Sequence, residues 1–106
     1  MEVNIMENKE QKRFSECPDF ETVHIRVSDG NAVLMKATVE LLYKAGYLST
    51  SLVQRKLTVG YGRAVKAIEL MRDNGIVTMY RDEERNRIFY LPAVGYDKAA
   101  EWLDTL

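Results

Sequence analysis

The sequence has almost none of the residues that build metal sites, disulfides or catalytic triads. Among 106 residues there is one cysteine, Cys17, and one histidine, His24. A structural zinc site is built from several cysteine or histidine ligands and a disulfide from a cysteine pair, so neither forms within one chain. No GxxxxGK[ST] or GxGxxG run is present, which excludes the usual glycine-rich phosphate loops. We therefore expect no metal, no cofactor and no enzymatic activity.

Long apolar runs are missing as well. The uninterrupted apolar stretches are only a few residues long, against the ~20 residues that a membrane-spanning helix needs. The first residues contain no apolar segment of the kind found in signal peptides. A lone cysteine is also typical of a reducing compartment. These features predict a cytoplasmic protein that does not associate with membranes.

Charge is distributed unevenly along the chain. The net charge is −1, but residues 49–75 carry +3 and residues 1–30 carry −3. The basic segment is either the solvated side of a helix or the surface that a nucleic-acid-binding protein requires. Residues 1–20 are polar and lack a hydrophobic period, so we predict a disordered acidic tail there. The rest, residues 21–106, is long enough for one domain.

Hydrophobic periodicity divides this domain into helices followed by strands. Leu34, Thr38, Leu41 and Leu42 recur at helical spacing, and Gly46 follows where a left-handed helix end is expected. Beyond residue 75 the apolar residues alternate, which is typical of strands. The pattern predicts a strand over 21–27, helices over 30–45, 50–57, 61–74 and 96–106, and hairpin strands over 76–80 and 87–91.

The order of these elements is that of a winged helix-turn-helix. This α+β fold has three helices and a two-stranded wing, here extended by an N-terminal strand and a C-terminal helix. The third helix has one apolar face, and we expect its opposite face to enter the major groove of double-stranded DNA. Gly60 and Gly62 are small, which allows a close backbone approach. On the same face, Arg63 can bind a guanine edge with two hydrogen bonds, and Lys66 a guanine or a phosphate.

Further side chains are predicted to bind the DNA backbone. The start of the helix over 50–57 offers hydroxyls and free N–H groups to a phosphate, and its end carries two basic residues. The wing carries arginines, although its acidic tip favours only a partial contact. Tyr61 either packs in the core or offers its hydroxyl to a phosphate. The predicted backbone contacts are Ser49, Thr50, Ser51, Arg55, Lys56, Tyr61, Arg81, Arg85 and Arg87.

The stretch STSLVQRKLTVGYGRAVKAIELMRDNGIV, residues 49–77, resembles the gamma domain of FtsK/SpoIIIE-type bacterial DNA translocases. The resemblance implies a winged helix that binds a short, oriented, G-rich duplex sequence. It also implies base contacts from Gly62 and Arg63 and a further basic contact from Lys66. The family usually has Asn where Gly62 stands, and this sequence contains no ATP-binding loop of a motor.

Two hypotheses on function follow. The first is a sequence-preferring DNA-binding protein, such as a small bacterial or phage transcription regulator or an accessory factor of mobile DNA. The alternative is a winged-helix protein–protein interaction module that does not bind DNA, indicated by Leu70 on the polar side of its helix and by the acidic wing tip. The C-terminal helix, with Trp102, Leu103 and Leu106 on one side, either closes the core or forms half of a homodimer seam.

Overall fold

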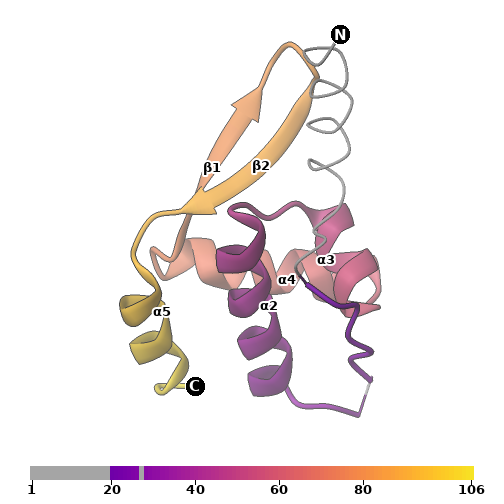
Figure 1. Ribbon diagram of the computed structural model, residues 1–106, viewed down its shortest axis with the longest axis vertical. Helices are drawn as coiled ribbons and strands as arrows, with labels where there is room; N and C mark the ends of the chain where they lie inside the picture. Colours follow the sequence, from indigo (N-terminus) through magenta and orange to yellow (C-terminus); the bar gives the residue numbers. More distant parts are fainter. Residues whose placement is uncertain (1–19, 27) are drawn as a thin grey trace, which may run out of the picture.

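The computed structural model describes residues 20–26 and 28–106 (Figure 1). A group of helices forms the base of the molecule, and a long two-stranded hairpin projects away from it (Figure 1). The predicted winged helix-turn-helix is thereby confirmed. Its elements are α2 (Asn31–Ala45), α3 (Thr50–Leu57), α4 (Tyr61–Asp73), β1 (Val77–Asp82), β2 (Arg87–Pro92) and α5 (Tyr96–Leu103).

Helix α2 forms the centre of the hydrophobic core. Its helical spacing gathers Leu34, Leu41 and Leu42 on one side, where all three are buried. The buried Thr38 hydroxyl donates to the Leu34 carbonyl at 2.7 Å, so its burial leaves no unpaired polar group. Gly46 ends the helix in the left-handed conformation, with φ of 86°, as the sequence predicted.

Helices α3 and α4 form the helix-turn-helix. The Leu52 N–H donates to the Ser49 hydroxyl at 3.1 Å, so Ser49 caps the start of α3. Thr58 ends α3 in the left-handed region, with φ of 56°, and turns the chain toward α4. The predicted bounds of α3 are confirmed, and those of α4 differ by one residue. The side of α4 that packs on the core consists of Ala64, Ala67, Ile68 and Met71.

The wing is an antiparallel hairpin in which Met79 pairs with Tyr90 and Arg81 with Ile88. Leu48 extends it on one edge, because Leu48 and Tyr90 exchange two backbone hydrogen bonds of 2.8 Å. The tip comprises residues 83–86, shorter than the 81–86 loop that the sequence predicted, since β1 continues to Asp82. The two strands were otherwise placed correctly.

The predicted N-terminal strand is wrong for the residues that the structure describes. Residues 20–26 are extended, but they pair with the end of a helix rather than with a strand: the Val23 and Ile25 N–H groups donate to the Lys56 and Leu57 carbonyls at 2.7 and 3.1 Å. We call residues 20–26 and 28–29 the arm. The β-branched residues of this segment alternate in the sequence, which is typical of a strand, but of residues 21–26 Ile25 alone is buried.

Two further sequence predictions concern this end of the chain. The predicted tail lies outside the described residues, except for Phe20, which packs against the core. The run Ser28-Asp29-Gly30-Asn31 predicts a side-chain cap for α2, and this prediction is wrong: Gly30 stands at the N-cap with no side-chain hydrogen bond. The Asp29 carboxylate instead accepts from the Arg26 N–H at 2.8 Å and so closes a turn just before the helix.

Helix α5 packs on α2 within the same chain and adds buried Ala99 to the core. The Tyr43 hydroxyl donates to the Val94 carbonyl at 2.6 Å, and the Tyr96 hydroxyl donates to Glu40 at 2.7 Å. The two tyrosine rings meet edge to face, with centroids 5.5 Å apart. Burial raises the pKa of Tyr43, whereas the hydrogen bond to Glu40 and then its charge raise the pKa of Tyr96.

Candidate nucleic-acid interface

Helix α4 presents a polar face to solvent. Gly62, Lys66, Glu69 and Asp73 recur along it at three- and four-residue intervals, and all four are exposed. The lysine lies in the first half of the helix and the carboxylates in the second. The basic half therefore coincides with the helix N-terminus, whose free N–H groups already favour anions. This first half of α4 is the part suited to a polyanion.

Tyr61 stands at the edge of this face and not in the core. Its side chain is 67 % exposed, so of the two alternatives raised by the sequence, core packing is wrong. The phenol borders a shallow groove of about 240 Å³ between α4 and the wing. The groove is also lined by Thr50, Val65, Ile68, Glu69, Arg72, Ile88 and Tyr90. A ligand lying along α4 would meet the Tyr61 hydroxyl on this side.

The start of α3 and the wing enclose a second, more polar depression of about 470 Å³. Its lining combines the three hydroxyl residues predicted to bind phosphate with two of the predicted arginines: Ser49, Thr50, Ser51, Arg55, Arg87, Ile88 and Phe89. The Ser49 hydroxyl is already occupied as the α3 cap, while the N-terminal N–H groups of α3 lie beside it. The structure thus brings together residues that lie more than thirty positions apart in the sequence.

The wing arginines do not share one face. Opposite residues of an antiparallel pair lie on the same face, so Arg81 joins Ile88 and Tyr90 on the side of the α4 groove. Arg87 lies opposite Asp82 on the other face. Arg85, at the tip, pairs with the Asp82 carboxylate at 3.8 Å. Asp82, the last residue of β1, therefore already engages the positive charge of Arg85 at the tip.

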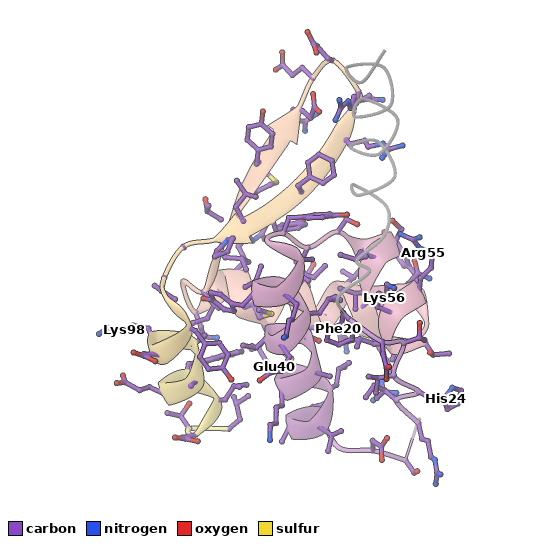
Figure 2. All side chains as sticks on the ribbon, viewed as in Figure 1. Phe20, His24, Glu40, Arg55, Lys56 and Lys98 are labelled. Carbon is purple, nitrogen blue, oxygen red and sulfur yellow. The ribbon has the colours of Figure 1, made fainter. Side chains whose placement is uncertain are left out.

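Arg63 does not extend from the exposed side of α4. It is half-buried, and its guanidinium donates to the Arg26 carbonyl at 3.0 Å and to the Asp29 carbonyl at 3.4 Å. Lys56 is half-buried where the arm joins α3, and the labelled side chains of Arg55 and Lys56 lie on the α3 side of the molecule, far from Lys98 on α5 (Figure 2). Base contact by Arg63 stays a prediction, and this side chain has other partners in the structure.

Two residues of this surface were missed by the sequence analysis. Arg72 and Ile88 line the same groove as Tyr61. Arg72 follows Tyr61 by eleven positions, about three helical turns, so helical spacing alone could have placed it on the same flank. Ile88 is 40 % exposed although it is apolar, and only the hairpin register reveals which way it faces.

Other chemistry has little support in the described part of the chain. His24 is exposed and points outward from the arm (Figure 2). No three His, Cys, Asp or Glu side chains among residues 20–26 and 28–106 are grouped as a metal site would need. Over the same residues, no helix is both long and apolar enough to span a membrane. Cys17 lies outside the described residues.

These features define a winged helix-turn-helix whose third helix is exposed beside a wing. The family model of the FtsK gamma domain matches residues 29–91, more than half of the chain. The chain belongs to the FtsK gamma domain family, which agrees with the resemblance seen at residues 49–77. The arm up to residue 28 and helix α5 lie outside the matched region.

Two curated relatives are DNA translocases named FtsK. The protein of Caldanaerobacter subterraneus subsp. tengcongensis is 35 % identical over 68 residues, which cover 64 % of this chain and 9 % of the relative. That of Treponema pallidum is 45 % identical over 49 residues, 46 % of this chain and 6 % of the relative. The chain thus spans less than a tenth of these relatives. No solved structure gives a significant match.

Proposed function

We propose that this domain binds double-stranded DNA with sequence preference, with the first half of α4 in the major groove. The observation that supports this most directly is the exposed face of α4 around Gly62 and Lys66, at the positive end of the helix. A helix inserts into the major groove when its backbone and short side chains can approach the base edges. In this proposal the exposed Lys66 donates to a guanine there.

The surroundings of α4 support the same orientation. The start of α3, with Thr50 and Ser51, and Arg87 of the wing line one depression, and Arg81 lies on the opposite face of the wing, with Ile88 on the side of the α4 groove. Tyr61 and Arg72 line that groove. In this proposal these groups bind phosphates and hold the domain in register, whereas the α4 face distinguishes sequences. Membership of the FtsK gamma domain family, and relatives named DNA translocases, support DNA as the ligand.

The experiment is selection from a pool of random duplexes, followed by affinity measurements over a salt series. We expect enrichment of a short motif containing guanine, with affinity that falls steeply as salt rises. Lys66→Gln should lower the preference at one base pair by roughly 5- to 150-fold, the range of about 1–3 kcal/mol for a base contact. Lys98→Gln removes the same charge from distant α5 and should change neither quantity. No enrichment, with binding only near ~10⁻⁴–10⁻⁶ M, would refute the proposal.

A second candidate function is a protein-interaction module. Leu70 is 37 % exposed and borders a groove of about 320 Å³ with Leu34 and Met35, on the flank of α4 away from the wing. An apolar floor of this kind suits a protein partner better than a nucleic acid. Under this hypothesis Leu70→Ala abolishes partner capture, binding survives high salt, and Lys66→Gln, which changes a charged residue at the same groove, is less harmful than Leu70→Ala. Retained capture by Leu70→Ala would exclude this hypothesis.

Finer aspects of the proposal depend on the cell and on assembly. A role in the cytoplasm as a transcription regulator predicts that the selected motif occurs near promoters, and a role as an accessory factor of mobile DNA predicts that it occurs near the ends of mobile elements. Chromatin immunoprecipitation with sequencing would distinguish the two. The last helix ends at Leu103 and not at residue 106 as the sequence predicted, and Trp102 and Leu103 pack against the core of the same protomer. The homodimer alternative is left with exposed Tyr96 and Leu106. Sedimentation of the free domain distinguishes monomer from dimer, and Leu106→Glu should dissociate a dimer built on the C-terminal residues.

A further inference from the structure

The arm is joined to both helices of the helix-turn-helix. Two of its N–H groups donate to the last carbonyls of α3, at Lys56 and Leu57, and the Thr58 hydroxyl donates to the Val23 carbonyl at 2.9 Å. Helix ends leave carbonyls without intrahelical partners, so the arm satisfies groups that would otherwise face solvent. Ile25 is 5 % exposed and inserts into the core at this point.

Arg63 connects the other end of the arm to α4. One guanidinium nitrogen donates to the Arg26 carbonyl at 3.0 Å and another to the Asp29 carbonyl at 3.4 Å. The two residues are joined in a turn, because the Asp29 N–H donates to the Arg26 carbonyl at 3.0 Å and the Asp29 carboxylate accepts from the Arg26 N–H. The side chain therefore binds a closed turn, with the fork geometry for which arginine is suited.

We propose that Arg63 is a positioning residue that fastens the arm to α4 and thereby fixes the angle between α3 and α4. For its functional part this inference rests on the proposed DNA binding, because that angle sets how α4 meets the duplex. The arm binds the end of α3 through its N–H groups and the start of α4 through Arg63, so the two helices share one brace. Residues 20–28 of the arm lie outside the region that the family model matches, whereas Asp29 and Arg63 lie inside it.

Base contact would require Arg63 to give up both arm carbonyls. A hydrogen bond from a charged donor is among the stronger polar interactions, and the abandoned carbonyls would lose a partner as well. The position of Arg63 on the helix also argues against a base contact. Arg63 lies on the flank of α4 that carries Leu70, whereas Gly62 and Lys66 lie on the exposed face. In this arrangement Lys66 contacts the bases and Arg63 holds the helix that carries it.

The test compares Arg63→Gln and Arg63→Lys with Lys66→Gln, on the selected duplex and on single-base variants of it. We expect Arg63→Gln to lower affinity roughly tenfold, as the loss of charge-assisted hydrogen bonds would. The loss should spread over all base pairs rather than fall on one, and the salt dependence should stay unchanged because no phosphate contact is lost. Arg63→Lys keeps the charge but not the fork, and should recover only part of the affinity.

A second readout needs no DNA. In Arg63→Gln, hydrogen exchange of the Val23, Ile25 and Asp29 amides should accelerate about tenfold, while the α2 core amides stay protected. Asp29→Ala, which opens the turn, should accelerate the same amides, and Asp29→Asn, which keeps the acceptor, should not. In the double variant Arg63→Gln and Asp29→Ala, the exchange rates of these amides should differ by less than about twofold from those of Arg63→Gln alone. The two substitutions are not additive because both remove the same attachment of the arm to α4.

The outcomes separate this inference from the proposed function. If Arg63→Gln removes preference at a single base pair and leaves the arm amides protected, Arg63 contacts a base and the brace role is wrong. If the unmodified domain binds no duplex, the proposed function fails, and the exchange measurements still decide whether Arg63 fastens the arm. If the variants accelerate exchange throughout α2 as well, Arg63 supports the whole core and the specific brace is refuted.

Discussion

Gly62 allows the proposed interface to be tested with a single methyl group. It is the second residue of α4, it is exposed, and a Cβ added there meets no atom within 4 Å. Glycine costs a helix about 0.5–1 kcal/mol relative to alanine. Gly62→Ala should therefore stabilise the free domain by about that amount, which raises Tm by roughly 4–8 °C per kcal/mol for a domain of this size. Urea unfolding followed through Trp102 measures the change.

The same methyl should weaken DNA binding. Groove insertion brings the start of α4 against the base edges, and an extra methyl in a close-packed contact costs about 1–3 kcal/mol, roughly 5- to 150-fold in affinity. Fluorescence anisotropy on the selected duplex gives this number. Gly95→Ala, an equally open glycine before α5, is the matched control and should bind normally. Equal or tighter DNA binding by Gly62→Ala would refute the close approach, and unchanged stability would refute the helix-propensity argument.

Three further outcomes follow from the fold. Ser49→Ala should lower the free energy of unfolding by about 1 kcal/mol, because it removes the α3 cap, whereas Ser51→Ala should lower it by much less; chemical unfolding compares them. Leu41→Ala, at a fully buried site, should cost about 2–5 kcal/mol and unfold the domain well below the unmodified melting temperature. Tyr96 has a raised pKa in the folded state, so its bond to Glu40 contributes stability that is complete below pH 10 and is lost as pH rises through the higher folded pKa. Tyr96→Phe should remove that part of the alkaline loss, and a stability profile identical to that of the unmodified domain would refute this role.

Local sequence was sufficient for the elements that depend on local rules. Helix α3 begins beyond a serine cap, α2 ends at a left-handed glycine, and the change to alternating residues after Gly75 marks the wing. These features were predictable because capping, glycine conformation and side-chain periodicity act within a few residues.

The parts that failed depend on partners distant in the sequence. Alternation in the arm could not reveal that its N–H groups bind the end of a helix rather than a strand. A helical projection places Arg63 near the polar side of α4, but the two carbonyls that hold it belong to residues more than thirty positions earlier. The position of Tyr61 was left open for a related reason. Helical spacing puts Tyr61 beside the core residues of α4, but in the fold it lies at the groove next to the wing, where it is 67 % exposed. Register and packing across the fold decided these cases.

The bridge between Leu48 and Tyr90 has a mechanical consequence. Leu48 immediately precedes the Ser49 cap, so two hydrogen bonds of 2.8 Å tie strand β2 to the first turn of α3. We therefore expect the wing and the start of α3 to move together, so that the distance between their two polar surfaces changes little when a ligand binds. In the proposed complex, a duplex that contacts both the wing and the start of α3 finds the two surfaces at a fixed spacing. Little conformational entropy is then lost in forming the second contact once the first is made.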